Sequence, residues 1–306
     1  MKHSLISPFG LAVLASISLV SPAMATVSID WTSIGNAGNA ADTTGYGAVS
    51  YGYNIGTYDV TNAQYVEFLN AKGASNSAGI YNSTMGNTNN SPYTYGNITQ
   101  SGSSGSYTYS VSSTYASNPV VGVTWFDAAR FCNWLQNGQG SGSMETGAYT
   151  LSGATSGIIS ANADAQIRLP SENEWYKAAY YNGGTGTYSL YPNGQNTIAP
   201  ADANYYYGQG SLGVVDVTYG TPSSYGAHIG GNVWQWNDAV ISGSYRGLRG
   251  GSWDNFDNSL ASSNRNFNDP SFVSRYTGFR VASVPEPTSG VLTILASGML
   301  LIRRKR

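Results

Sequence analysis

The sequence predicts an α+β domain with few helices, short strands and many loops. Two observations lead to this prediction. Three segments begin with the same helix-capping pattern, and the remaining chain resembles short strands and turns rich in glycine, tyrosine and asparagine. The 306 residues include 38 glycines and 24 tyrosines, and only 10% are charged. This composition is typical of irregular backbone held by hydroxyl and amide groups.

The three predicted helices share a capping pattern. They lie in "VTNAQYVEFLNA", "VTWFDAARFCNWLQN" and "LPSENEWYKAAYY". In each, the hydroxyl of the N-cap residue can accept from the backbone amide three residues later, and the side chain of that later residue can accept from the N-cap amide. Apolar side chains follow at helical spacing. The N-cap residues are Thr61, Thr124 and Ser171, and their acceptors are Gln64, Asp127 and Glu174.

The other segments predict short strands and loops. From Gly73 to Asn118 the chain has no charged residue, and alternation such as Tyr-Thr-Tyr indicates short strands. After Gly183 we expect no further helix, and the closing "TGFRVASV" is predicted to be the last strand. Large indole rings are expected to anchor such a loop-rich fold, with each N–H finding a partner. The candidates are Trp125, Trp134, Trp175, Trp234, Trp236 and Trp253.

The two ends predict export signals. Residues 1–25 have a basic start, a short apolar run and the small-x-small triplet Ala23-Met24-Ala25, a pattern that predicts a signal peptide cleaved after Ala25. The alternative is a membrane anchor, for which the apolar run is short. Residues 285–306 contain a Pro-Glu-Pro triplet, an apolar stretch and a basic end. Its fifteen apolar residues would rise about 22 Å against a hydrocarbon core of roughly 30 Å, which predicts a transient membrane anchor.

Charge and cysteine content exclude several classes. Removing both signals leaves residues 26–284 as one domain, with nine basic and fifteen acidic side chains and a net charge of −6, compared with −2 for the whole chain. An acidic domain lacks the electrostatic surface that nucleic acid requires. One cysteine in an exported protein also excludes an intramolecular disulfide framework.

The C-terminal segment resembles the PEP-CTERM sorting signal of Gram-negative bacteria. The resemblance rests on the triplet, the short apolar run and the basic end, in that order. It implies that an exosortase processes the tail and that the protein passes through the inner membrane to the outer surface or extracellular matrix. An ordinary C-terminal anchor is the alternative.

Six segments together resemble the formylglycine-generating enzyme (sulfatase-modifying factor) domain. They are "YDVTNAQYVEFLNA", "NPVVGVTWFDAARFCNWL", "IRLPSENEWYKAAYY", "GGNVWQWND", "RGGSW" and "GFRVA", spread over residues 58–282. The resemblance implies a loop-rich α+β domain related to C-type lectins, often with bound calcium. Well-known members oxidise a substrate cysteine to formylglycine with copper and oxygen.

The copper ligands that the resemblance implies are missing. In the family, two cysteines follow the Gly-Gly-Ser-aromatic corner, and those positions fall near Asn255 and Leu260. Cu(I) prefers thiolates, and the one cysteine, Cys132, lies on the apolar face of a predicted helix. Sister enzymes bind iron through three histidines, whereas His228 is the single histidine outside the signal peptide. We therefore expect neither copper nor iron.

Some family site positions are retained. Ser252 matches the serine of the corner and Trp236 a site tryptophan, so both are catalytic candidates. The alternative for Ser252 is a turn serine that bonds local backbone. Family arginines match Arg249, Arg265 and Arg280, which we interpret as buried donors to carboxylates or carbonyls, with a substrate-carboxylate role as the alternative.

Calcium is the metal ion that the resemblance favours. One candidate set comprises Gly230, Gly231, Val233 and Gln235, and a second comprises Asn204, Tyr205 and Asp216. Gln235 stands where the family has a carboxylate, and the lost charge weakens binding of a hard cation. The alternative is that hydrogen bonds alone hold both loops.

The residues thus support an exported domain without copper chemistry that binds an exopolysaccharide or a surface protein. The competing hypothesis is an oxidase, or another non-haem-metal enzyme of the superfamily, with an altered site. A third is a structural matrix protein with no specific ligand. Whether the domain is an enzyme is left open between these hypotheses, because a fold alone does not specify activity.

Overall fold

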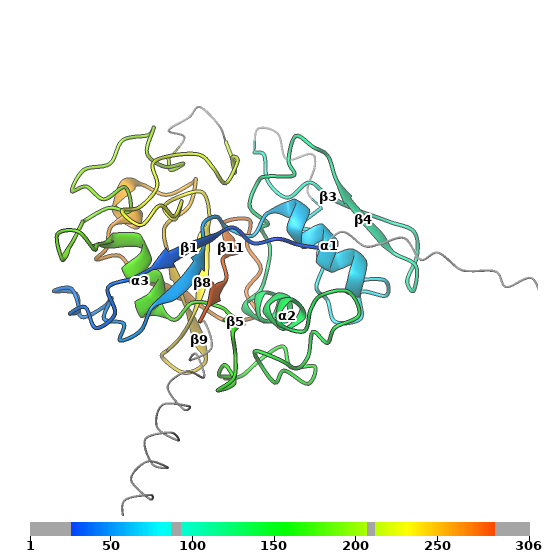
Figure 1. Ribbon diagram of the computed structural model, residues 1–306. Helices are drawn as coiled ribbons and strands as arrows, with labels where there is room; N and C mark the ends of the chain where they lie inside the picture. The colour runs from blue at the N-terminus through cyan, green and yellow to red at the C-terminus, as the bar shows by residue number, and fades with distance from the viewer. Residues whose placement is uncertain (1–25, 87–92, 207–211, 285–306) are drawn as a thin grey trace, which may run out of the picture.

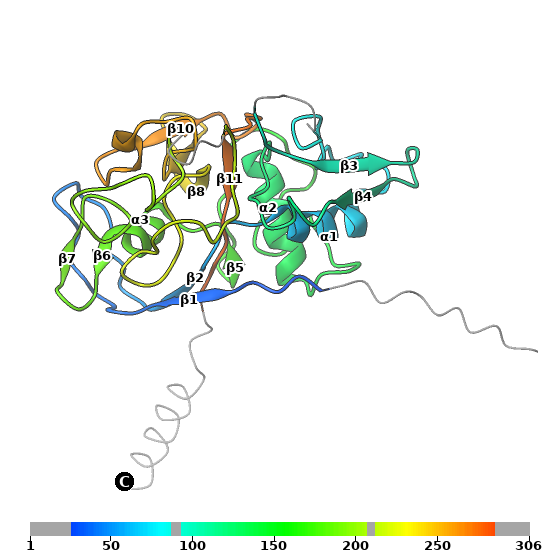
Figure 2. The same ribbon diagram turned by 90° about the horizontal axis from the view of Figure 1, so that it is seen from above.

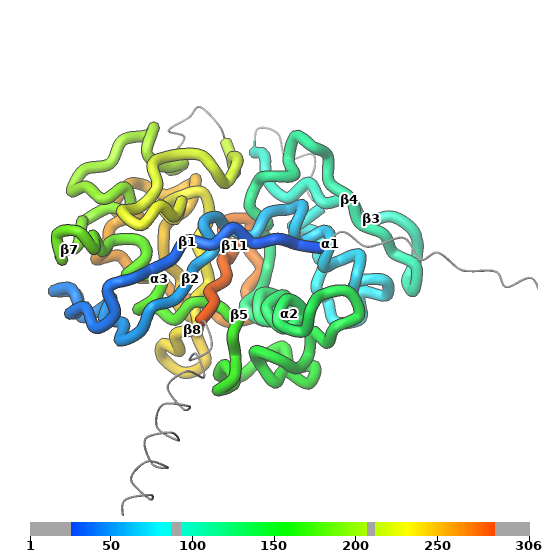
Figure 3. Tube along the Cα trace, viewed as in Figure 1, coloured from blue at the N-terminus to red at the C-terminus, as the bar shows by residue number. Residues whose placement is uncertain are grey.

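The computed structural model describes residues 26–86, 93–206 and 212–284. The predicted signal peptide and sorting tail lie outside these residues. Within the described ranges, no helix has the length and apolar character needed to cross a membrane. Long segments without regular secondary structure connect the short helices and strands, as Figure 3 shows.

Three capped helices confirm the predicted starts. They are α1 (Asn62–Lys72), α2 (Trp125–Gln136) and α3 (Glu172–Tyr180), and each has a complete capping box at the predicted N-cap. Figures 1 and 2 show α1 and α2 together on one side of the central strands and α3 on the other.

Two four-stranded sheets form the centre of the described chain. The first has the order β1-β2-β12-β5 and is antiparallel throughout. The second has the order β10-β9-β8-β11, in which β11 runs parallel to β8. The bounds are β1 (Trp31–Ile34), β2 (Tyr53–Gly56), β5 (Ile167–Arg168), β8 (Trp234–Ile241), β9 (Tyr245–Arg249), β10 (Asn266–Asn268), β11 (Thr277–Phe279) and β12 (Ala282–Ser283).

The closing segment forms two strands instead of the predicted one. β11 belongs to the second sheet and β12 to the first, so the chain changes sheets between them. Arg280 lies at this crossing, fully buried, and its guanidinium donates to Asp59 at 2.9 Å and to the Gly56 carbonyl at 2.6 Å. The hydrogen bonds of Arg280 to distant residues separate β11 from β12, and the sequence of the closing segment does not reveal these partners.

Two small hairpins confirm that uncharged stretches form short strands. β3 (Ile98–Ser101) pairs with β4 (Thr108–Val111) inside the uncharged region, and β6 (Tyr181–Asn182) pairs with β7 (Thr187–Tyr188). The expectation of no helix after Gly183 was wrong at one point, because residues Asp257–Leu260 form the 3-10 helix η1. A single 3-10 turn needs no periodic apolar face, so the pattern gave no sign of it.

The six tryptophans are buried as predicted. Trp134, Trp175 and Trp236 donate their indole N–H groups to Gly140 O, Gln235 Oε1 and Val123 O. The expectation that every indole finds a partner was wrong within the described residues, where the N–H groups of Trp125 and Trp253 have none.

The family arginines are donors to carboxylates and carbonyls, as predicted, but Arg249 and Arg280 are buried whereas Arg265 is exposed. Arg249 and Arg265 both bind Glu172, which lies at the start of α3 and is only 6% exposed. Arg249 also donates to the carbonyls of Ser262 and Asn264. One carboxylate thereby joins α3 to the end of β9 and to the loop that leads into β10.

Candidate functional site

The Gly-Gly-Ser-Trp corner joins the end of β9 to η1. Gly250 and Gly251 have φ values of 101° and 71°, in the left-handed region that suits glycine. A Cβ on Gly251 would lie 2.6 Å from Leu260 Cδ1. Asn255 closes the corner, because its Oδ1 accepts hydrogen bonds from the Ser252 amide at 3.1 Å and the Ser252 hydroxyl at 2.7 Å. The hydroxyl thus bonds a side chain, not the local backbone expected for a turn serine.

A pocket of about 210 Å³ opens beside this corner, and we call it the corner pocket. Its wall is made by the corner, the edge strand β10, and the loop that leads to β11. The wall combines amides, hydroxyls and the Asp254 carboxylate with aromatic rings. The polar members include Ser252, Asn255, Asn266, Asn268, Ser274 and Thr277, and the aromatic members are Trp234, Phe272 and Tyr276.

The three asparagines of the corner pocket are each held through the side-chain amide oxygen. Asn266 and Asn268 alternate along β10 and accept hydrogen bonds at Oδ1 from the amides of Phe267 and Asp269, at 2.8 and 2.9 Å. Asn255 is held through Oδ1 in the same way. None of the three Nδ2 groups donates a hydrogen bond within the described ranges. Because the oxygens are tied to the protein, the groups left to meet a ligand are N–H donors.

Aromatic packing holds the far wall of the pocket. Trp253 is fully buried between Tyr93 and Tyr276, with ring centroids 5.6 and 5.2 Å away. The Arg275 guanidinium lies 4.8 Å from the Tyr276 ring and 4.9 Å from the Tyr93 ring, within cation–π range. These contacts fix the position of the Tyr276 ring in the pocket wall.

The two predicted catalytic residues occupy different places. Ser252 lies in the wall of the corner pocket. Trp236 is fully buried, donates its indole N–H to Val123 O at 2.9 Å, and does not line the pocket. The tryptophan in the wall is Trp234. Sequence reasoning missed Asn266 and Asn268, whose Asn-x-Asn spacing on a strand was the available signal.

The donor set around the corner does not fit copper. Asn255 and Leu260 take the positions of the family cysteines, and Leu260 is fully buried. Cys132 is also fully buried, within α2, and burial raises the pKa of its thiol. In the part of the chain that the structure describes, no three His, Cys, Asp or Glu side chains could jointly hold a metal ion. A soft-metal oxidase site therefore has no thiolate pair here.

In the first predicted calcium set, the Gln235 side chain is fully engaged. Its Oε1 accepts hydrogen bonds at 2.6 Å from both Trp175 and Arg280, and its Nε2 donates to the Ile229 carbonyl at 3.0 Å. The Arg280 guanidinium also donates to the His228 carbonyl. An indole and a guanidinium thus occupy the Gln235 side-chain oxygen, so this side chain is not free to bind calcium.

The second predicted set contains an unsatisfied oxygen. Asn204 is 1% exposed, and its Nδ2 donates to Gly213 O and Asn232 Oδ1, but its Oδ1 has no partner within the described residues. This residue lines a polar cavity of about 10 Å³, the size of one water molecule or ion. The structure brings the two sets together here, because Asn204 pairs with Gly231 and Gly230 lines the same cavity.

The other two members of that set do not line the Asn204 cavity, and Asp216 lines a different one beside Tyr58 and Asp59. Asp216 Oδ1 accepts from the Thr218 amide and hydroxyl, and Oδ2 accepts no hydrogen bond within the described residues. Tyr205 follows Asn204 directly and is half-buried. Oxygen donors of this kind suit a hard cation such as calcium.

Comparisons with known proteins agree with this architecture. A family model described as the sulfatase-modifying factor enzyme 1-like domain matches residues 35–284. The solved structure of Treponema denticola variable protein 1 is similar, with a TM-score of 0.58, 25% identity, and coverage of 86% of this chain and 97% of that chain. CarF has the same TM-score at 21% identity, covering 85% of this chain and 100% of that one, and shows the fold alone.

A curated relative is similar over a shorter length. The serine/threonine-protein kinase pkn1 of Chlamydia pneumoniae is 28% identical over 188 residues, which cover 55% of this chain. The match spans 24% of that relative, so this chain corresponds to about a quarter of its length.

Proposed function

The chain belongs to the sulfatase-modifying factor enzyme 1-like family, and from that premise we propose that it is an exported binding protein whose corner pocket takes carbohydrate. The observation that carries the proposal is the orientation of Asn255, Asn266 and Asn268, whose Oδ1 atoms are bound to the protein while their Nδ2 groups are left without protein partners. Sugars present many hydroxyl oxygens, and amide N–H groups are donors to such oxygens.

The aromatic walls support the same ligand class. Tyr276, Phe272 and Trp234 offer apolar faces between the polar groups, a combination typical of small-molecule sites. Immediately after Asn255, Phe256 is 56% exposed and stacks on Tyr206 at a centroid distance of 4.0 Å. An exposed pair of rings beside amide donors suits a sugar ring, which has apolar C–H faces and polar edges.

The donor chemistry also separates this proposal from the oxidase alternative. Copper oxidation of a cysteine needs a soft metal, and the polar groups of the corner pocket are amides, hydroxyls and the Asp254 carboxylate, with no thiolate among them. A hydrogen-bonding pocket needs none of that chemistry. Binding is therefore the function that these residues support best.

The proposed location follows from the two ends of the sequence. Residues 1–25 direct export and are removed, and residues 285–306 anchor the chain transiently in the inner membrane until an exosortase processes them. The protein then reaches the outer surface or the extracellular matrix of a Gram-negative bacterium. An exopolysaccharide there is the partner we propose, with a surface protein as the second candidate.

Glycan binding is expected to depend on the β10 asparagines. Asn266→Ala and Asn268→Ala should each weaken binding of an exopolysaccharide fragment by about tenfold, since a net hydrogen bond is worth about 1 kcal/mol and its partner is left unsatisfied. Titration calorimetry on the purified protein measures this. Asn54→Ala, on β2 outside the pocket, serves as the matched control and should bind like the wild type. Equal affinity for all four proteins would exclude the corner pocket.

Calcium is expected to stabilise the fold through Asn204. We propose that Asn204 Oδ1 and the Tyr205 carbonyl would hold the ion, which would satisfy the orphaned amide oxygen. At a calcium concentration of 100 times Kd, a single site should raise the free energy of unfolding by about 2.7 kcal/mol. Thermal unfolding in calcium and in EDTA measures the shift. Asn204→Ala should abolish the calcium effect, and an unchanged effect in that variant would place the ion elsewhere.

A further inference from the structure

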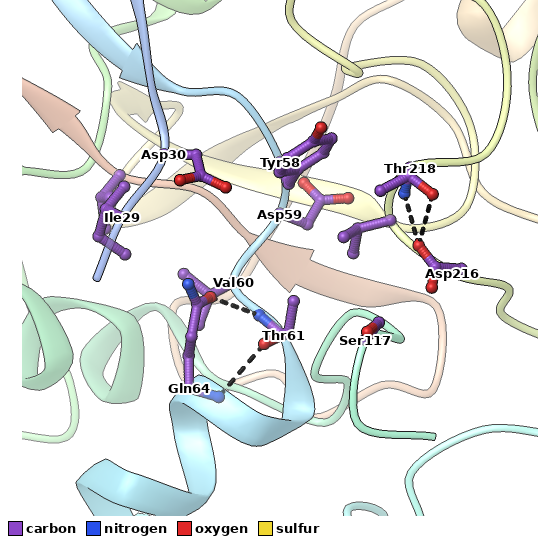
Figure 4. Close-up of a pocket in the computed structure, with 12 residues that line it drawn as sticks. Ile29, Asp30, Tyr58, Asp59, Val60, Thr61, Gln64, Ser117, Asp216 and Thr218 are labelled. Atoms are coloured by element: carbon purple, nitrogen blue, oxygen red, sulfur yellow. Dashed lines mark hydrogen bonds between the residues drawn. The ribbon is translucent and has the colours of Figure 1, made fainter. Parts of the chain in front are cut away.

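A second cavity of about 230 Å³ lies apart from the corner pocket. Five segments surround it: the chain before β1, the link between β2 and α1 with the first turn of α1, the loop at Ser117, the loop around residues 216–218, and the link from β11 to β12. Figure 4 shows the labelled side chains around it, with Asp30, Tyr58 and Asp59 on neighbouring segments and Asp216 on the loop to the right.

The charge of this cavity has one sign. Asp30, Asp59 and Asp216 contribute three carboxylates, and the described residues that line the cavity include no lysine, arginine or histidine. The Asp30 side chain is exposed and makes no hydrogen bond within the described part of the chain. Asp216 is exposed as well and has Oδ2 unused, because Thr218 binds only Oδ1. The walls therefore attract a cation.

Asp59 adds a largely buried carboxylate, one oxygen of which no described residue binds. Its side chain is 6% exposed, and its Oδ1 accepts from Arg280 at 2.9 Å. No hydrogen bond within the described residues reaches Oδ2, which leaves that oxygen to the cavity. Burial raises the pKa of this carboxyl to about 6, although the Arg280 charge acts to lower it. One cationic partner therefore does not offset the cost of burying this carboxylate.

The shape favours an organic cation over a metal ion. Within the described residues the carboxylates do not gather into a group of three that could hold one metal ion. Between them lie the apolar side chains of Ile29, Val60, Val217 and Val281. The Tyr58 ring belongs to the same wall and offers a face for a cation–π contact. Apolar surface between carboxylates matches a charged head on an alkyl stem.

We propose that this cavity binds a primary alkylammonium group, the chemistry of a lysine side chain or of a free alkyl diamine. The ammonium donates to the carboxylates of Asp59 and Asp216, and the methylenes pack on the valines. Asp30 lies at the open side and attracts the cation during approach. This site is separate from carbohydrate binding, so either function can fail without the other.

The probe is pentane-1,5-diamine, titrated by calorimetry into the full-length protein in EDTA, so that calcium does not contribute. We expect saturable binding that weakens at high salt, and no binding of the neutral pentane-1,5-diol. Asp30→Asn and Asp216→Asn should each weaken binding about two- to fivefold, as expected for partly exposed ion pairs. Asp164→Asn, an exposed carboxylate outside the cavity, gives the matched control and should leave affinity unchanged. Asp59 is left intact because it also pairs with the buried Arg280.

N-acetyl-lysine methylamide forms the second arm and distinguishes the sources. Tighter binding of this lysine analogue than of the diamine would support a protein side chain as the ligand, and the reverse would support a free amine. The proposal is overturned if neither probe saturates, if the diol binds as well as the diamine, or if both aspartate variants bind like the wild type.

Discussion

Replacement of Glu172 by glutamine is expected to lower the free energy of unfolding by about 3–5 kcal/mol. Glu172 Oε1 accepts from Arg249 Nε and Nη2 at 2.9 and 2.7 Å, and both carboxylate oxygens accept from Arg265. Glutamine removes the negative charge and turns one acceptor into a donor. The Arg249 side chain is 1% exposed, so its charge would remain buried without a counter-charge.

Most of this loss should come from Arg249. The Arg265 side chain is 31% exposed, so solvent screens its charge when the carboxylate is removed. Urea unfolding followed by tryptophan fluorescence measures the change. Asp164→Asn makes the same charge change at an exposed position and should shift stability by less than about 0.5 kcal/mol. If Glu172→Gln shifts stability as little, the cluster does not hold α3 to the loops.

The free energy of unfolding is expected to fall as pH rises from about 4 to about 7. Burial raises the pKa of Asp59 and of Asp127 to about 6, and that of Asp238 to about 7. A carboxyl with a higher pKa in the folded state binds its proton more tightly there, so its protonated form stabilises the fold. That stabilisation is complete below the unfolded pKa and is lost as pH rises through the folded pKa.

An opposite effect limits stability at lower pH. Burial acts to raise the pKa of Glu174, but hydrogen bonds and charge from Arg168 outweigh it, so this pKa is lowered. Stability from Glu174 is present above its unfolded pKa and is lost as pH falls through its folded pKa. Together these groups predict a stability maximum in mildly acidic solution.

Each carboxyl whose pKa is raised to about 6 should contribute a fall on the order of 3 kcal/mol, since a difference of one in pKa corresponds to ~1.4 kcal/mol. Urea midpoints measured at intervals between pH 3.5 and 8 test it. Asp238→Asn should flatten the upper part of the curve, because Asp238 has the highest pKa of the three. A curve that rises steadily to pH 8 would contradict the prediction.

Local sequence signals predicted the elements that local physics controls. A capping box involves an N-cap residue and one three positions later, so "TNAQ", "TWFD" and "SENE" marked the helix starts without any knowledge of the fold. The closing "TGFRVASV" was predicted less well. Its division between two sheets depends on Arg280 reaching Asp59, 221 residues away along the chain.

In the candidate site too, the sequence predicted the features that depend on neighbouring residues. The corner with Ser252 was visible as a motif, because glycines of positive φ and the next few residues form it. The partners of Ser252 across the pocket were not visible. Asn266 and Asn268 reach that pocket because β10 pairs with β9, a register set by strand pairing rather than by any nearby residue.

By itself the sequence determined the α+β class, the three helix starts, the corner and the lack of a thiolate pair, since each depends on residue identity or short-range spacing. The tertiary structure alone decided which polar groups meet. It bound both polar ends of Gln235, left Asn204 Oδ1 unsatisfied, and brought Asp30 and Asp216 to one cavity. Hydrogen bonding and burial at these positions depend on contacts between residues far apart in the chain, and such contacts exist only once the chain has folded.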